Sequence, residues 1–247
     1  GIIYDPKKIG LDVPANLIES CYFPIIQSGG TFDLRPTART DDKELKHDVI
    51  IASIGARYKN YCGSVSRTFL VNPPNKVRDS YGILLQLYDV CLGQMVHGGR
   101  LSRVVEEAKQ FLERRHPELA AYLPKSLGFA IGLEFRDSQL NINAKNTGTF
   151  QEGQTFVLSV GFQNVPLLDN EKQGSDLNAF SLLIADTVLV QRDGAPEILT
   201  KTKKDFVDIS YQLGDGSDQE QEEVKMEESG FGDGVGVRLR SREDRHL

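Results

Sequence analysis

Two apolar runs separated by a short turn constrain this 247-residue chain more than any other feature. The first, VIIASIGAR at 49–57, is apolar without helical spacing, and the second, YCGSVSRTFLV at 61–71, alternates more clearly between polar and apolar residues. Runs of this kind, rich in β-branched and aromatic residues, are typical of strands. Lys59 and Asn60 lie between the two runs, where a hairpin turn would fall. The pattern predicts an antiparallel hairpin, and a hairpin of this length belongs to a sheet.

Two helices are predicted directly after the hairpin. The first opens after Pro74 and stops at Gly98, and its apolar residues recur every three or four positions. Those residues are Leu84, Leu85, Tyr88, Cys91, Leu92 and Met95. The second helix carries an apolar stripe over 101–112 with charged residues outside it, Ser102 as a candidate cap and Pro117 just past its end.

Further strand-like runs lie in the second half of the chain. They are at 155–162, 180–190 and 197–199, after a glycine-punctuated segment at 127–135. The first 24 residues are expected to contain one short helical piece, near 14–20. Because helices are inserted between pairs of strands, we predict an α+β fold whose strands are mostly antiparallel. No internal repeat is legible in the sequence.

The net charge of −6 is concentrated at the C-terminal end of the chain. Ten acidic and five basic residues lie from 214 onward, whereas 25 acidic and 24 basic residues leave the first 213 almost neutral. We therefore expect 1–213 to form the folded domain and 214–247 to be a disordered linker, first acidic and then basic. The acidic stretch at 214–233 is either a linker that keeps the chain soluble or a segment that attracts a basic partner electrostatically.

Composition excludes several classes of protein. No window approaches the roughly 18 consecutive apolar residues of a membrane helix, and no signal-peptide pattern follows Gly1. Because the chain opens on Gly1 rather than Met, we expect it to be an excised fragment. The three cysteines lie far apart without a CxxC pattern, which argues against a zinc ribbon or a disulfide scaffold and fits a reducing compartment. The near-neutral 1–213 lacks the positive field expected of a nucleic-acid-binding protein.

The usual catalytic motifs are absent from the sequence. It contains no P-loop, GxSxG or GxGxxG pattern, and no histidine has a second histidine or a carboxylate at metal-ligand spacing. Solvated or capping roles are therefore favoured for His47, His97, His116 and His246. Cys62, within an apolar run, is interpreted as buried and inert.

Four sequence blocks nevertheless carry a family resemblance. They are IGARYKNYCGSVSRTFLV, LGFAIGLEFRDS, FQEGQTFVLSVGF and LLIADTVLVQRDGAPEILT. In this order they resemble the creatinase/aminopeptidase P/methionine aminopeptidase family, whose fold is called pita-bread, and the resemblance runs from about Pro24 to Thr200. Together with the block PIIQSGG, they are similar in particular to the peptidase-like domain in the large subunit of the FACT histone chaperone. The resemblance implies a pita-bread fold for this chain.

The same resemblance implies that catalysis has been lost. Active family members hold two divalent metals with two Asp, one His and two Glu, because carboxylates must compensate the metal charge while a shared water becomes a nucleophile. Carried across block by block, these positions fall in that order on Ser53, Ser64, Phe129, Ser159 and Ala185. Phenyl and methyl groups offer no donor atom, and neutral hydroxyls are poor ligands for hard dications. The resemblance therefore implies a pseudo-aminopeptidase with no metal, cofactor or catalytic residue, and Asp186 beside Ala185 is interpreted as structural.

The resemblance also implies partners and a location. We expect an inactive module that binds core histones during nucleosome reorganisation in transcription, replication and DNA repair, in the nucleus and on chromatin. The second subunit of the chaperone would contact regions outside this chain, and neither a membrane nor a specific DNA sequence is expected as a partner. The five vacated positions form the candidate histone-peptide groove.

Two alternatives stay open at this point. A structural docking domain would use its outer surface and leave the cleft unused. An active metallopeptidase is suggested by the family and contradicted by the five vacated positions.

Overall fold

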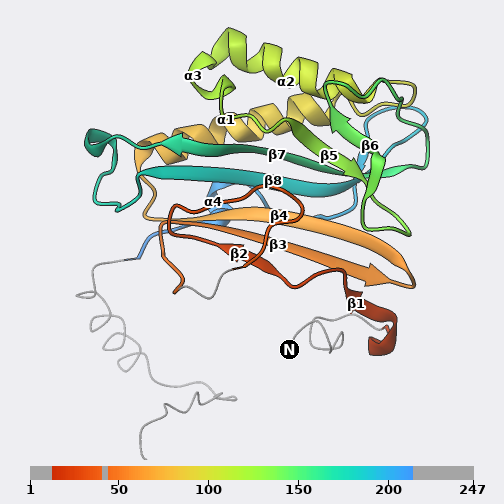
Figure 1. Ribbon diagram of the computed structural model, residues 1–247, viewed down its shortest axis with the longest axis horizontal. Coiled ribbons are helices and arrows are strands. Elements are labelled where there is room, and N and C mark those ends of the chain that lie inside the picture. The colour runs from red at the N-terminus through yellow and green to blue at the C-terminus, as the bar shows by residue number, and fades with distance from the viewer. Residues whose placement is uncertain (1–12, 41–43, 214–247) are drawn as a thin grey trace, which may run out of the picture. The chain divides into compact units, whose positions relative to one another are not determined.

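The computed structural model describes residues 13–40 and 44–213 (Figure 1). The described residues up to Gln212 belong to one compact unit. The linker expected at 214–247 lies outside the described residues, so its disorder stays a prediction.

Ten strands in the described part of the chain form one sheet with the order β1-β3-β4-β8-β7-β5-β6. Three short strands lie off this path: β2 pairs with β3, β9 with β8, and β10 with β4. The strands are β1 (Ile18–Ser20), β2 (Ile25–Gln27), β3 (Val49–Tyr58), β4 (Tyr61–Val71), β5 (Ser126–Ala130), β6 (Asp137–Asn143), β7 (Thr155–Pro166), β8 (Ala179–Leu189), β9 (Glu197–Ile198) and β10 (Ser210–Tyr211). Every pairing is antiparallel except that of β10 with β4, which confirms the predicted sheet type.

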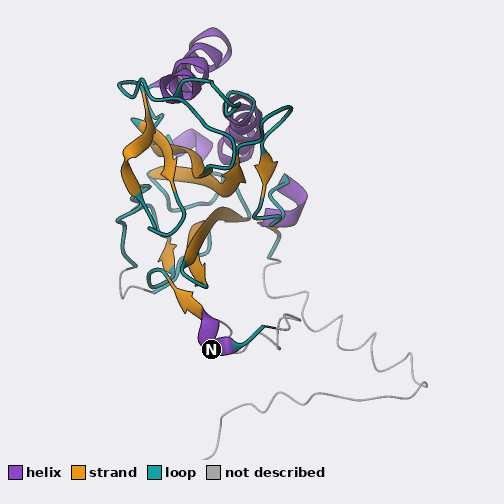
Figure 2. Ribbon diagram, turned by 90° about the vertical axis from the view of Figure 1, so that its right-hand side faces the viewer, coloured by secondary structure: helices purple, strands orange, loops and turns teal. Residues whose placement is uncertain are grey.

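The two helices predicted after the hairpin are α1 (Asn75–Leu92) and α2 (Leu101–Arg115), although α1 ends at Leu92 and so leaves out Met95. Two short helices were not predicted, α3 (Pro117–Ala120) and α4 (Phe206–Ile209), and 3-10 turns lie at Ala15–Leu17 and Asp169–Glu171. Helix α1 packs on β7 and β8, and α2 packs on α1 and β6, so the helices gather on one side of the sheet (Figure 2). The α+β prediction is confirmed.

The hairpin of β3 and β4 turns where the sequence predicts. Tyr58 pairs with Tyr61, and the two residues between them have positive φ angles, 46° at Lys59 and 71° at Asn60. Two successive left-handed residues match the right-handed twist of the flanking strands, and asparagine tolerates this conformation better than most residues.

Several local expectations differ from the structure. The helical piece expected near 14–20 is only a 3-10 turn, and the chain then enters β1, which pairs with β3. Ser102 does not cap α2: the residue before the helix is Arg100, and Ser102 is buried inside the first turn. Pro117 lies just past the end of α2 at Arg115, as predicted, and it also begins the short helix α3. At these points, pairing and packing with distant residues outweigh the local sequence signal.

The two faces of the sheet are packed differently. On β7, Phe156 and Leu158 point into the large core that includes α1 and α2. Val157, between them, belongs to a smaller apolar cluster with Phe129 and Ala185. Because side chains alternate along a strand, this smaller cluster lies on the face away from the helices.

A buried ion pair fixes the C-terminal part of the domain to the helix-covered face. Arg67 on β4 and Asp186 on β8 approach to 2.7 Å, and their side chains are 4% and 0% exposed. Asp186 also accepts hydrogen bonds from the hydroxyls of Tyr88 and Thr200. The other guanidinium N–H groups donate to the backbone carbonyls of Ser66, Ala185, Thr202 and Lys203. Asp186 thus makes structural contacts, in agreement with the interpretation from the sequence.

Candidate functional site

The five positions singled out in the sequence come from five strands and line one cavity. Those positions are Ser53 on β3, Ser64 on β4, Phe129 on β5, Ser159 on β7 and Ala185 on β8. Strand register explains why they meet: Ser66 on β4 pairs with Ser53 on one side and with Ala185 on the other, and Ala185 pairs with Ser159. The structure therefore brings all five together on the face of the sheet away from the helices.

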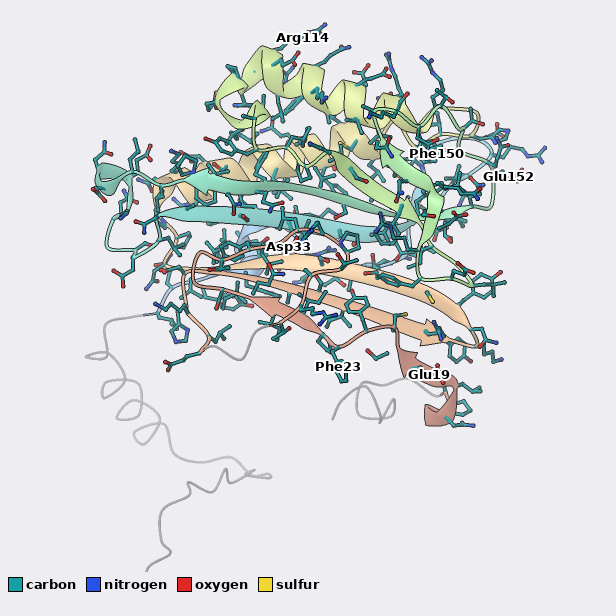
Figure 3. All side chains as sticks on the ribbon, viewed as in Figure 1. Glu19, Phe23, Asp33, Arg114, Phe150 and Glu152 are labelled. Atoms are coloured by element: carbon teal, nitrogen blue, oxygen red, sulfur yellow. The ribbon has the colours of Figure 1, made fainter. Side chains whose placement is uncertain are left out.

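The cavity is small. Its volume is about 40 Å³, and since one enclosed water needs roughly 10–15 Å³, it has room for about three waters. Its roof is formed by the segment at 22–38, which crosses the sheet and includes the labelled Asp33 (Figure 3). The space left between this segment and the sheet suits a small polar group better than a long side chain.

Hydroxyl groups occupy the polar side of the cavity. Ser66 donates a hydrogen bond of 2.7 Å to the hydroxyl oxygen of Ser53, and the hydroxyls of Tyr22 and Ser64 lie 3.1 Å apart. Burial raises the pKa of Tyr22, so its phenol stays protonated at neutral pH. These hydroxyls satisfy one another without any charged group.

Aromatic rings occupy the other side of the cavity. Phe129 is 4% exposed and lies 5.6 Å from Phe135, whose ring meets Tyr22 edge-on at 5.1 Å. The guanidinium of Arg136 lies over the Phe129 ring at 5.6 Å and also donates to Asn141. Such ring pairs stabilise packing beyond the area that they bury. The position that the resemblance assigns to a metal-binding histidine is therefore part of an aromatic cluster.

Only two of the described side chains that line the cavity are charged, and they neutralise each other. Arg35 donates to both carboxylate oxygens of Asp33, at 2.7 to 3.0 Å. Its hydrogen bonds lower the pKa of Asp33 and keep the carboxylate ionised. The amide of Gln27 holds the backbone of Asp33 at both its N–H and its carbonyl. Nowhere among the described residues do three His, Cys, Asp or Glu side chains gather in a group that could hold a metal ion.

A wider hollow of about 590 Å³ adjoins the cavity and shares part of its lining. The shared residues are Tyr22, Ile25, Pro36 and Ala38. The hollow adds Phe23, Thr37, Arg39 and Thr40, and the Phe23 side chain is 93% exposed (Figure 3). An extended polypeptide could therefore lie in the hollow and reach the cavity.

Several lining residues of the site were not singled out from the sequence, among them Ser66, Tyr22 and Phe135. Ser66 could have been identified from the sequence, because it lies two residues after Ser64 and therefore on the same face of the predicted strand. Tyr22 and Phe135 carry no local signal, since they reach the cavity only after distant segments have packed. Every helix in the described part of the chain is too short or too polar to span a bilayer.

Comparison with known proteins agrees with this architecture. Residues 10–192 match the model of metallopeptidase family M24. The FACT complex subunit SPT16 of Arabidopsis thaliana is 39% identical over 223 residues, and that of Zea mays is 37% identical over 219 residues. The matches cover 89% and 87% of this chain but only 20% of each relative, so the chain spans about a fifth of their length.

Solved structures extend the comparison to the fold. The N-terminal domain of FACT complex subunit SPT16 from Cicer arietinum superposes with a TM-score of 0.79 and 39% identity, over 85% of this chain and 49% of that chain. An X-Pro aminopeptidase from Thermotoga maritima gives a TM-score of 0.63 at 22% identity, over 78% and 50% of the two chains. The second likeness shows the fold alone and confirms the pita-bread expectation. This chain therefore belongs to metallopeptidase family M24, and within its fold it is similar to the N-terminal domain of SPT16 proteins.

Proposed function

We propose that this chain is a catalytically inactive member of its family that serves as a histone-binding module of a FACT-type chaperone. The observation that supports the loss of catalysis is the single cavity lined by all five vacated ligand positions. At those positions the chain places three hydroxyls, one phenyl ring and one methyl group. A pair of hard dications needs carboxylates to balance its charge, and Asp33, the nearby carboxylate, is already paired with Arg35.

Metal analysis and a peptidase assay test this part of the proposal. We expect the purified chain to contain no stoichiometric Mn, Co, Zn or Fe and to release no amino acid from peptides that begin with Met or Xaa-Pro. About two equivalents of transition metal per chain, together with chelator-sensitive release of amino acids, would show an active dinuclear site and overturn the proposal.

Histone binding is proposed from the similarity to SPT16 proteins, which are subunits of the FACT complex. Two separable components are expected. The acidic stretch at 214–233 supplies a salt-sensitive component, since exposed charges are screened over about 8 Å at physiological ionic strength. The nearly neutral 1–213 supplies a weaker component, less dependent on salt, through the cavity and the adjoining hollow.

Binding of core histones to 1–213 and to 1–247, at low and at moderate salt, separates the two components. We expect truncation to remove most of the salt-sensitive binding and to leave the remainder. Loss of all binding at both salt concentrations would show that 214–247 is the only binding element. Phe129→Ala opens the cavity wall and is expected to change the remaining binding in a chain that still melts cooperatively.

The domain boundary is part of the same proposal. Because 214–247 offers few apolar side chains to offset the entropy of ordering, we expect limited proteolysis to remove it without lowering the Tm. A cooperative loss of stability on truncation after Leu213 would contradict that boundary. A nuclear, chromatin-associated location and a second chaperone subunit that contacts other parts of a longer protein complete the proposal.

A docking role through the outer surface is the second candidate, and one observation favours it. The hydrogen bond between Tyr22 and Ser64 and the ring contacts of Phe135 already fill most of the site. If Phe129→Ala leaves the histone binding of a folded chain unchanged, the contact lies on the outer surface.

A further inference from the structure

The cavity contains hydroxyl groups that can still form hydrogen bonds, whereas its two charged side chains are paired with each other. Ser159 is half-buried on β7, and its hydroxyl makes no hydrogen bond to any described residue. Ser53 accepts a hydrogen bond from Ser66, so its own hydroxyl proton remains available. Ser53 on β3 and Ser159 on β7 lie three strand spacings apart, about 14 Å, with Ser66 and Ala185 between them. One small polar group that enters can therefore bond to only one of these hydroxyls.

The dimensions of the cavity limit what can enter. Its volume of about 40 Å³ is bounded by Tyr22, Phe129 and Phe135, which contact one another. Tyr22 cannot recede toward β3, because its ring already lies against the backbone of Gly55, where even an added Cβ would collide with it. A methyl, hydroxymethyl or hydroxyethyl group fits such a space, whereas a leucine or lysine side chain would have to displace a packed ring.

Charge imposes a second restriction. An ammonium or guanidinium group inside the cavity would lose its water, and burial of an unpaired ion is strongly unfavourable. The one lining carboxylate, Asp33, is held by Arg35, whose own charge would repel the incoming cation. The family's two Asp and two Glu positions, which could have paired with a cation, carry Ser53, Ser64, Ser159 and Ala185.

We propose that the cavity selects an uncharged stretch of extended peptide whose Ala, Ser or Thr side chain enters between Phe129 and Ser159. The Ser159 hydroxyl bonds to this residue, and residues further along the peptide lie in the hollow beside Phe23 and Thr37. The inference rests on the proposed histone-binding function and specifies it: the cavity binds a histone at a non-basic stretch. Lysine and arginine side chains stay outside.

Three synthetic peptides of equal length, uncharged except at one central position, test the selection on the full chain. The central residue is Thr, Lys or Leu, and binding is followed by amide chemical shifts. We expect the Thr peptide to shift the amides of Phe129 and Ser159 and to bind at least about tenfold more tightly than the other two, a difference of about 1.4 kcal/mol. Equal affinity of the Thr and Lys peptides, or shifts confined to another surface, would overturn the inference.

Two substitutions at one position sharpen the test. Ser159→Asp introduces a carboxylate into the cavity and is expected to shift the preference toward the Lys peptide. Ser159→Leu fills the space and should abolish binding of the Thr peptide. The control is Ser138→Asp, because Ser138 is exposed on β6 and does not line the cavity, so this variant should keep the original preference. A preference that Ser159→Asp leaves unchanged in a chain with unaltered Tm counts against the inference.

Histone binding measured in parallel separates the two proposals. If core histones bind and the Thr peptide does not, the selection is wrong while the histone-binding function stands. If the Thr peptide binds at the cavity and core histones do not, the histone-binding function fails.

Discussion

Thr68 and Thr187 make the same pair of hydrogen bonds on opposite sides of the point where β4 and β8 meet. The Thr68 hydroxyl accepts from the N–H of Leu183 and donates to its carbonyl, at 2.8 and 3.0 Å. The Thr187 hydroxyl does the same with the N–H and carbonyl of Ser64, at 2.9 Å for both bonds. Between them, Ser66 and Ala185 form the one registered pair of the two strands.

The contacts around the Ser66–Ala185 pair therefore have an approximate local two-fold symmetry. Each threonine lies two residues beyond that pair on its own strand, and Arg67 and Asp186 face each other one residue beyond it. The strands separate on either side, so their backbone groups need other partners. Threonine hydroxyls supply those partners by standing in for the missing ladder bonds.

Removal of the Thr68 hydroxyl and removal of the Thr187 hydroxyl should destabilise the fold by similar amounts. Thr68→Val and Thr187→Val each leave a buried backbone N–H and carbonyl without partners, which costs about 1–3 kcal/mol. We expect both variants to lower the free energy of unfolding by comparable amounts in urea titrations, with the m-value unchanged. If one substitution left the free energy of unfolding unchanged and the other lowered it strongly, Thr68 and Thr187 would not be equivalent.

Asp186 should be among the most sensitive positions in the domain. Asp186→Asn leaves the guanidinium of Arg67 buried without its counterion, and breaking a buried pair in this way costs about 3–5 kcal/mol. Asp169→Asn is the matched control, because Asp169 pairs with Lys172 at the exposed surface. Chemical denaturation should show a large decrease in the free energy of unfolding for Asp186→Asn and only a small decrease for Asp169→Asn. Equal losses would mean that the buried pair has no special role.

High pH should destabilise the domain through its buried tyrosines. Burial and the neighbouring Asp186 raise the pKa of Tyr88 above its ordinary value of about 10. Because the folded-state pKa is the higher one, the unfolded chain loses this proton first, so the stabilisation is complete below pH 10 and declines as the pH rises further. Tyr88→Phe should weaken this decline between about pH 9 and 11, although it also removes a hydrogen bond to Asp186 at neutral pH. Tyr58→Phe, at an exposed position, should leave the pH profile unchanged.

Elements with strong local signals could be predicted, and those that depend on pairing could not. The β3–β4 hairpin and the helices α1 and α2 follow from apolar spacing and turn residues. The sequence of β6, DSQLNIN, has little strand character, and it becomes a strand because it pairs with β5 at the edge of the sheet. The two-fold relationship was not legible because its equivalent triplets, SRT and ADT, share only the threonine.

The site divides in the same way. The five positions that the family resemblance assigns to metal ligands lie in separate sequence blocks, and they line one cavity in the structure. Tyr22 and Phe135 also line this cavity but come from outside the five strands that carry those positions, and their place there depends on how distant segments pack. The volume of the cavity and the pairing of Asp33 with Arg35 likewise follow from tertiary structure.

A carboxylate introduced at a position that the resemblance assigns to a metal ligand should destabilise the fold and produce no peptidase activity. Ser53→Asp places a carboxylate in a buried site whose nearest polar neighbour is the Ser66 hydroxyl. Burial should raise the pKa of the new carboxyl above that in the unfolded chain, so the variant should be most stable at low pH and lose stability as the pH rises through the folded-state value. No turnover is expected, because the ligands of a dinuclear site act as a unit. Ser138→Asp, on the exposed face of β6, controls for the added charge. Urea titrations from pH 4 to pH 8, with and without Mn²⁺, provide the measurement, and a metal-dependent gain in stability with peptide hydrolysis would show that the site is closer to function than its lining indicates.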